Sequence, residues 1–362
     1  MLVISRNTAF TYQGKRIDTK QIGRELGVRY VLEGSVRRSG NRVRVNAQLI
    51  DAERDAHLWA DRFDGDTSDL FALQDEVTSR IANALGVELV RAEAARPTQN
   101  PDALDYIFQG RLAVWKPRSR EMWAGAISLF ERALTLDPSS VQAQSWLAMT
   151  LAARTLSDMS DQAAVDLADA ERLVAQALAV SPASPLAHLA KGEVLRAQGR
   201  PEEAIPEYET AIASNRTSVY AISALAQCKL WIGSIEDVIP AQERAIRLSP
   251  RDPNIFLFYL HIGLVYMLQS NTDEAIVWFQ KARNATPAHP SIRALLASVY
   301  ALNGDTERAA TELAEARRLS GDDRYTSITC LKAARYWGVP KVRALLEATY
   351  FAGLRKAGMP EE

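Results

Sequence analysis

The chain has few of the residues that build disulfide frameworks and metal sites. Two of its 362 residues are cysteine and four are histidine. Cys228 and Cys330 lie about a hundred residues apart without paired spacing, which argues against disulfides and for a reducing compartment. The histidines show no ligand spacing with cysteines or carboxylates. The sequence therefore predicts a cytoplasmic protein with no metal ion and no other cofactor.

Charge of one sign and long apolar runs are also lacking. Lysine and arginine number 43 against 44 aspartate and glutamate residues, so no global field favours nucleic acid or a membrane surface as partner. The opening stretch MLVISRNTAF lacks the basic start and apolar core of a secretory signal. The most apolar run, Ile255 to Leu268, has 14 residues, fewer than the ~20 that span a bilayer. We expect a buried helix there and no membrane segment.

Catalytic motifs are missing as well. The sequence contains no glycine-rich phosphate loop, no GxSxG nucleophile elbow and no HExxH zinc helix. Asp64-Gly65-Asp66 offers too few oxygen ligands for a calcium loop. The sequence therefore predicts a protein without enzymatic activity.

What the sequence does contain is a pair of amphipathic helices that recurs, most regularly at residues 185–218. The first helix has an apolar stripe, and Pro201 suits the first turn of the second helix. The second helix presents a small–large–small face made of Ala204, Tyr208 and Ala211. A lone hairpin of this kind cannot bury its stripe, so it needs stacked neighbours.

The small–large–small face returns in five further second helices. Its members are Ala126, Phe130 and Ala133; Ala170, Val174 and Ala177; Val238, Gln242 and Ala245; Ala275, Phe279 and Ala282; and Ala309, Leu313 and Ala316. The period of about 34 residues resembles the tetratricopeptide (TPR) repeat. This resemblance implies a mainly α fold, a TPR α-solenoid of helix-turn-helix repeats. We expect about six repeats over residues 105–321 and capping helices over residues 322–362.

The first hundred residues follow a different pattern, which predicts a small α/β domain over residues 1–96. Asp18 can cap a helix, and strand-like runs follow at 28–38, 42–50 and 57–63. A helical period returns from Ser68. With a strand-like start at Leu2-Val3-Ile4, the expected order is β-α-β-β-β-α. Residues 97–104, which hold two prolines, form a linker.

Residues 2–95 resemble the TolB-amino-terminal-like domain of bacterial regulatory proteins, most specifically in RELGVRYVLEGSVRR. In many rhizobial and related proteins this domain lies between a class III adenylate cyclase domain and TPR repeats. Members of the family have an earlier strand and helix that this chain lacks, so the resemblance implies an incomplete α/β domain. A sheet that lacks a strand presents an open edge, and self-association through that edge is an expected contact.

Four arginines fall at the tip of the predicted hairpin: Arg37, Arg38, Arg42 and Arg44. They are a candidate anion contact on a β-ribbon. The alternative is a solvated tip whose charges discourage edge pairing. Nearby Glu33 and Asp51, and the lack of an aromatic stacking surface, favour this alternative. Nucleic acid is therefore not expected as a partner.

Stacked TPR repeats offer a concave groove, lined by first helices, in which a protein or peptide partner would bind. TPR geometry places these candidates there: Glu193, Arg196, Tyr220, Gln227, Trp231, Leu257, Leu260, Leu264 and Met267. The Lys and Asn residues with which chaperone-binding TPR proteins hold a terminal carboxylate are absent, so that role is not expected. The apolar face of the fifth repeat either receives an amphipathic partner segment or is covered by the carboxyl-terminal helices.

Three hypotheses about function follow. The first is a non-catalytic interaction module of a bacterial signalling protein, linked through the resemblance to an adenylate cyclase system. The second is a fragment of an adenylate cyclase whose catalytic domain lies outside this chain. The third is a fragment of a TPR-containing transcriptional regulator.

Overall fold

The structure is a computed structural model that describes residues 4, 6–12, 17–66, 70–96, 101–116, 118–157, 159–334 and 336–362. The chain divides into two compact units, residues 1–92 (unit 1) and 93–362 (unit 2). The strand predicted at Leu2-Val3-Ile4 falls mainly outside the described residues. The predicted fold class is confirmed: a helical solenoid with a small antiparallel sheet region.

Unit 1 contains one antiparallel sheet of order β1-β2-β3. Its elements are α1 (Arg6–Phe10), α2 (Thr19–Leu26), β1 (Tyr30–Ser39), β2 (Arg42–Asp51), β3 (Ala56–Asp66) and α3 (Leu70–Ala94). The carboxylate of Asp18 caps α2 by accepting the backbone N–H of Lys20 at 3.1 Å. Gly27 ends the same helix in the left-handed region, at φ 62°. The predicted helix and hairpin therefore form, whereas α1 was not predicted.

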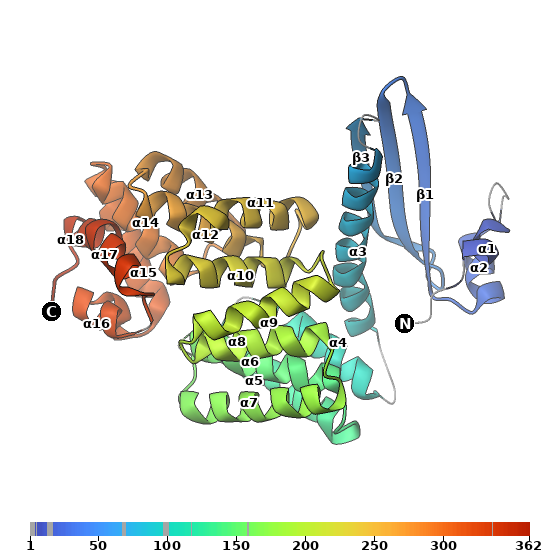
Figure 1. The fold of residues 1–362 in the computed structure, drawn as a ribbon, viewed down its shortest axis with the longest axis horizontal. Helices are drawn as coiled ribbons and strands as arrows, with labels where there is room; N and C mark the ends of the chain where they lie inside the picture. The colour runs from blue at the N-terminus through green and yellow to red at the C-terminus, as the bar shows by residue number, and fades with distance from the viewer. Residues whose placement is uncertain are drawn as a thin grey trace. The chain divides into compact units, whose positions relative to one another are not determined.

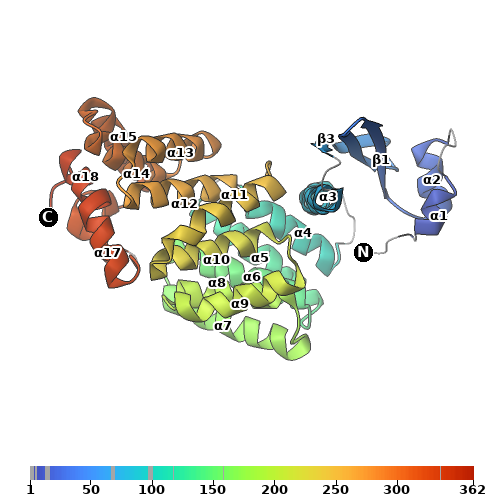
Figure 2. The ribbon, with the colours of Figure 1, turned by 45° about the horizontal axis from the view of Figure 1, so that its top comes forward.

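Helix α3 covers one face of this sheet (Figure 2). Ala47 and Leu49 of β2 pack with Trp59 and Phe63 of β3 and with Val77 of α3. Because successive side chains of a strand point to opposite faces, the polar residues between them lie on the other side of the sheet. The alternation read from the sequence thus defines the core of unit 1.

The apolar face of the sheet extends beyond the part that α3 covers. Leu32 and Val36 of β1 pair with Leu49 and Val45 of β2, which places them on the same face as the core. Their exposed fractions are nevertheless 47% and 70%. In the described sheet β1 has β2 as its strand neighbour and ends the sheet. Self-association through this edge stays a prediction.

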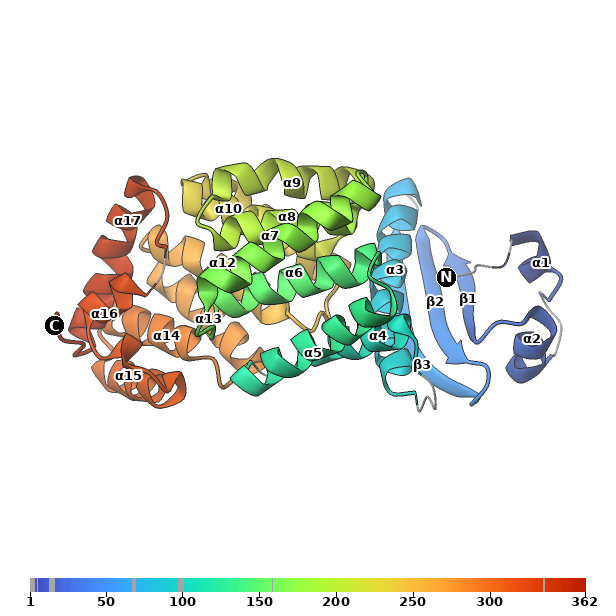
Figure 3. The same ribbon diagram turned by 90° about the horizontal axis from the view of Figure 1, so that it is seen from below.

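In unit 2 the described residues form six antiparallel helical hairpins (Figure 1). These hairpins are α4 (Ala103–Ala113) with α5 (Arg120–Leu136), α6 (Val141–Leu156) with α7 (Ala163–Val180), α8 (Pro185–Ala197) with α9 (Pro201–Ser214), α10 (Val219–Ile232) with α11 (Val238–Leu248), α12 (Ile255–Leu268) with α13 (Thr272–Ala285), and α14 (Pro290–Leu302) with α15 (Thr306–Ser320). A short 3₁₀ helix, η2 (Ile235–Asp237), precedes α11. Each hairpin packs on the next, as α5, α6 and α7 do in Figure 3.

The small–large–small faces are buried in all six described hairpins. Their central residues are at most 4% exposed: Phe130, Val174, Tyr208, Gln242, Phe279 and Leu313. Where the central residue is aromatic, its ring packs against a glycine of the first helix. A Cβ atom on Gly263, for example, would lie 2.6 Å from the Phe279 ring. In the sixth hairpin, Ala297 takes the place of that glycine and Leu313 that of Phe279. A smaller residue on the first helix therefore accompanies a larger central residue on the second helix.

This matching can be tested by exchanging the pairs. Gly263→Ala is expected to lower the free energy of unfolding by about 1–3 kcal/mol, because the added methyl group overlaps the Phe279 ring. The double variant Gly263→Ala with Phe279→Leu has the same residue types as the Ala297–Leu313 pair. We therefore expect it to lower the free energy of unfolding by less than the sum of the two single variants. Urea unfolding followed by circular dichroism measures all three variants. Additive losses would contradict the matching.

After α15 the chain folds back onto the last hairpin. Its elements are η3 (Asp323–Tyr325), α16 (Ile328–Ala333), α17 (Pro340–Leu346), the π-helix η4 (Glu347–Phe351) and α18 (Ala352–Lys356). The hydroxyl of Ser298 in α14 donates to the carbonyl of Tyr350 at 2.9 Å, and α18 packs along α14. The backbone N–H of Ile328 donates to the carbonyl of Pro360 at 2.9 Å, so the last residues fold back onto α16. We call the elements from η3 to α18 the cap.

The apolar run predicted to be a buried helix is α12, and ten of its residues are buried. No helix among the described residues combines the length and the apolar character needed to cross a membrane.

Candidate partner groove

The nine groove candidates do not share one environment. On α12, Leu260, Leu264 and Met267 are 9%, 7% and 0% exposed and belong to the hydrophobic core of the carboxyl-terminal half. The same core contains side chains of the cap: Val342, Leu346, Tyr350, Phe351 and Leu354. In this structure the apolar face of the fifth hairpin therefore packs inside the protein. A role for these three residues in partner binding stays a prediction.

The other candidates on α10 and α12 are half-buried. Trp231 packs against the same core, and its carbonyl accepts the backbone N–H of Val339 at 2.9 Å. Tyr220, Gln227 and Leu257 keep part of their surface accessible. The surface available to a partner is therefore mixed polar and aromatic, and less apolar than the sequence predicts.

Glu193 and Arg196 form a buried ion pair on α8. Glu193 is 0% exposed, and its carboxylate accepts from the Arg196 guanidinium and, at 2.7 Å, from the Tyr208 hydroxyl. Burial and the Glu193 charge both raise the pKa of Tyr208. Burial opposes the charge of Arg196, but the Glu193 carboxylate outweighs it and raises the pKa of that guanidinium. Glu193 is thus compensated within the third hairpin.

The titratable groups next to this ion pair are neutral at pH 7. Burial raises the pKa of the Cys228 thiol to about 12, so the thiol stays protonated. Burial and the Arg196 charge lower the pKa of His261 to about 3, so its imidazole is uncharged. Its Nδ1 lies 3.0 Å from the side-chain nitrogen of Gln242. Burial and Glu193 raise the pKa of Tyr220.

Arg118, which the sequence did not indicate, adds a further charge to this region. It lies in the connection between α4 and α5, and its guanidinium carbon is 5.5 Å from the centre of the Phe256 ring on α12. It interacts electrostatically with Tyr220, Arg196 and Glu193. Side chains from α8, α10 and α12 therefore converge on one arginine of the first hairpin. We call Arg118, Arg196, Glu193 and Tyr220 the groove cluster.

Arg118 is accessible to solvent but incompletely hydrated. Its side chain is exposed, whereas the protein around it partly desolvates the guanidinium and lowers its pKa. Its recorded contact is with the Phe256 ring, and no hydrogen bond or ion pair joins it to the described residues. Its loop position lies outside the repeat positions used to predict the groove, which is why sequence periodicity could not find it.

The β1–β2 register places Arg37, Arg42 and Arg44 on one face of the sheet and Arg38 on the other. Arg37 stands opposite Arg44 in the β1–β2 register, and the neighbouring Arg38 lies on the other face of the sheet. Arg44 donates to Asp64 at 2.6 Å and thereby lowers the pKa of that carboxyl group. Arg42 stands opposite Ser39 on β1. A role for these arginines in anion contact stays a prediction.

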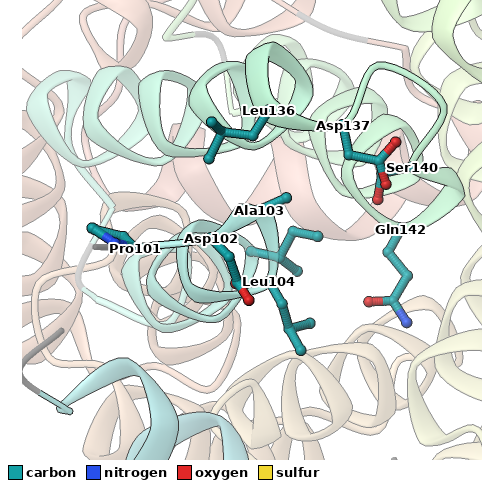
Figure 4. Close-up of a pocket in the computed structure, with 9 residues that line it drawn as sticks. Pro101, Asp102, Ala103, Leu104, Leu136, Asp137, Ser140 and Gln142 are labelled. Atoms are coloured by element: carbon teal, nitrogen blue, oxygen red, sulfur yellow. The ribbon is translucent and has the colours of Figure 1, made fainter. Parts of the chain in front are cut away.

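A hollow of about 620 Å³ lies between the start of α4, the end of α5 and the start of α6 (Figure 4). Leu104 and Leu136 line it and are 47% and 55% exposed. Its polar groups already serve local structure, since Asp102 caps α4 and Ser140 caps α6. This hollow therefore lacks the converging charges of the groove cluster.

Cys228 is a buried free thiol and Cys330 an exposed one. Within the described parts of the chain, no group of three or more His, Cys, Asp or Glu residues is arranged to hold a metal ion.

The stacked hairpins and their buried faces define unit 2 as an α-solenoid that contains TPR repeats. Residues 159–218 and 257–289 match the tetratricopeptide repeat. The APC/C hetero-tetramer Cut9–Hcn1 has a TM-score of 0.52 at 17% identity, over 73% of this chain and 48% of that one. The human IFIT1 dimer with m7Gppp-AAAA also has a TM-score of 0.52 at 17% identity, over 71% of this chain and 57% of that one. At such identities the likeness shows the fold alone.

One sequence relative of the chain has the name of an adenylate cyclase. A protein of Rhizobium meliloti (strain 1021) with the name "Putative adenylate cyclase 3" is 36% identical over 208 residues, which are 56% of this chain. The match spans 35% of that relative's length. The predicted resemblance to a rhizobial adenylate cyclase sequence is thereby confirmed. The two TPR matches lie outside unit 1, so its resemblance to the TolB-amino-terminal-like domain stays a prediction.

Proposed function

We propose that this chain is a non-catalytic protein-binding module of a bacterial signalling protein in an adenylate cyclase system. The observation that carries the proposal is the TPR array, in which the second helices bury their faces and the first helices leave Tyr220 and Gln227 partly accessible. Repeat arrays use such concave surfaces to bind extended partners. The name of the rhizobial relative supports the link to cyclic AMP synthesis.

The same match favours a second form of this proposal, in which the chain is a fragment of a longer cyclase polypeptide whose catalytic domain lies outside it. The relative is about three times as long as the matched segment, since the match spans 35% of it. The two forms differ in whether a catalytic domain is on the same polypeptide. In both, unit 2 binds protein and performs no chemistry.

Binding and catalysis can be tested separately. The tagged chain is used to isolate partners from rhizobial cells, with Gln227→Arg in the groove and Thr210→Arg on the second helix α9 as its matched control. We expect at least one protein to be retained by the wild type and by Thr210→Arg, and to be lost with Gln227→Arg. Incubation of the purified chain with ATP and Mn²⁺ should yield no cyclic AMP. Equal retention by both variants would contradict groove binding, and cyclic AMP formation would contradict a non-catalytic role.

A further inference from the structure

The groove cluster contains one positive charge that the protein does not neutralise. Glu193 is paired with Arg196, and the surrounding Tyr208, Cys228 and His261 are neutral. Arg118 remains, held against the face of Phe256; Tyr220 and Glu193 favour its charge, and Arg196 opposes it. An exposed guanidinium that has no hydrogen bond or ion pair to the described residues and rests on an aromatic ring is suited to a ligand that supplies the opposite charge.

Donor groups are also unused at this place. The Nε–H of Arg196 is buried and has no hydrogen-bond partner among the described residues. The guanidinium of Arg118 likewise has no hydrogen bond to them. Arginine guanidinium groups present several N–H donors in a planar fork that matches the two oxygens of a carboxylate. Two arginines from different hairpins, which interact electrostatically with each other, therefore have unused donors.

From these observations we propose that Arg118 and Arg196 bind the side-chain carboxylate of an aspartate or glutamate residue in an acidic peptide segment. This inference rests on the proposed function of unit 2 as a protein-binding module. The Phe256 ring supports the Arg118 guanidinium by cation–π contact, and the half-buried Tyr220 interacts electrostatically with both arginines. Arg118 is then a specificity-determining residue that reaches across the groove from the first hairpin.

The charge of the cluster favours a carboxylate over a phosphate group. Two arginines and Glu193 leave a net charge of +1, which one carboxylate neutralises. A phosphate monoester carries about −1.5 to −2 at pH 7, so it would leave excess negative charge beside the buried Glu193. A segment with an isolated acidic residue therefore fits the cluster better than a phosphorylated one.

The test uses the full chain with arginine side chains labelled with ¹⁵N. The probe is N-acetyl-glutamate methylamide, which carries one carboxylate in the setting of a peptide, and the uncharged glutamine derivative is its control. We expect saturable shifts of the Arg118 and Arg196 Nε–H signals with the glutamate derivative and none with the glutamine derivative. Arg118→Met should weaken binding at least tenfold.

Arg120→Met is the matched control, because Arg120 lies in the same connection, is exposed, and pairs with Asp161 at 2.7 Å. Binding should be unchanged in this variant. Arg118→Met should unfold at the same temperature as wild type or a higher one, because it removes an uncompensated charge from beside Phe256. A lower unfolding temperature with unchanged binding would show that Arg118 only joins the hairpins, and would overturn the proposal.

Two other results would also overturn it. Absence of saturable shifts would exclude a carboxylate site. Saturation by inorganic phosphate at lower concentration than by the glutamate derivative would assign the cluster to a phosphoryl ligand. Neither result touches the proposed function, because partner retention that depends on Gln227 needs no carboxylate.

Discussion

Glu193→Ala is expected to lower the free energy of unfolding of unit 2 by about 3–5 kcal/mol. The carboxylate of Glu193 is 0% exposed and accepts from both Arg196 and the Tyr208 hydroxyl. Its removal leaves a guanidinium that is only 15% exposed without its counter-charge, and a buried hydroxyl without its acceptor. Urea unfolding followed by circular dichroism measures the loss.

The adjoining helix provides a matched control. Arg200 and Glu203 form an ion pair with the same three-residue separation, but their side chains are 45% and 57% exposed. Glu203→Ala should lower the free energy of unfolding far less than Glu193→Ala does, because water replaces the lost contact. Adding Arg196→Met to Glu193→Ala should recover part of the loss, since no charge is then left buried. Similar losses for the two glutamate variants would show that Arg196 reaches solvent once its partner is gone.

Phe351→Ala is expected to lower the free energy of unfolding of unit 2 by about 3–5 kcal/mol. Phe351 is 3% exposed and packs edge-on against Trp337, with ring centres 5.2 Å apart, and against Tyr350 at 5.3 Å. This aromatic cluster belongs to the core that contains Leu264, so the truncation opens a cavity beneath the cap. The urea midpoint and the binding of a hydrophobic dye report the change.

Leu136→Ala is the control for this variant, because Leu136 is a large apolar residue with 55% of its surface exposed. Leu136→Ala should lower the free energy of unfolding by no more than about 0.5 kcal/mol. If Phe351→Ala cost no more than Leu136→Ala, the cap would be held by its backbone hydrogen bonds and not by burial of its aromatic side chains.

Helical periodicity was enough to predict the repeats. Within a hairpin the partner helix follows after a short turn, so a small–large–small face such as Ala275, Phe279 and Ala282 has one nearby surface on which to pack. The pairing of Gly263 with Phe279 follows from the same local geometry. In unit 1, the alternation along β2 and the Ser39-Gly40-Asn41 turn likewise predicted the hairpin, although Ser39 belongs to β1 and pairs with Arg42. Contacts between elements that are neighbours in the sequence can be predicted because a short turn allows few alternative packings.

The parts of the site that the sequence did not reveal depend on distant contacts. An apolar stripe on α12 shows that the helix is buried, but it cannot distinguish a partner's side chains from Phe351, which lies far along the chain. The repeat position of Glu193 predicts a groove residue, whereas its 0% exposure results from Tyr208 and Arg196 folding over it. Arg118 meets Phe256 because the first and fifth hairpins approach each other, and no local pattern encodes that approach.

The way the cap folds onto α14 also bears on assembly. A repeat array whose two ends are both bare has complementary faces, and molecules of this kind can add to one another head to tail without limit. Here the Ser298 hydroxyl is bound to Tyr350, and the main chain of Gly353 lies too close to Ser298 for a Cβ to fit. The face that a neighbouring array would need is already occupied, so growth of a filament at this end is blocked. By covering this face of α14, the cap keeps the molecule from polymerising at this end.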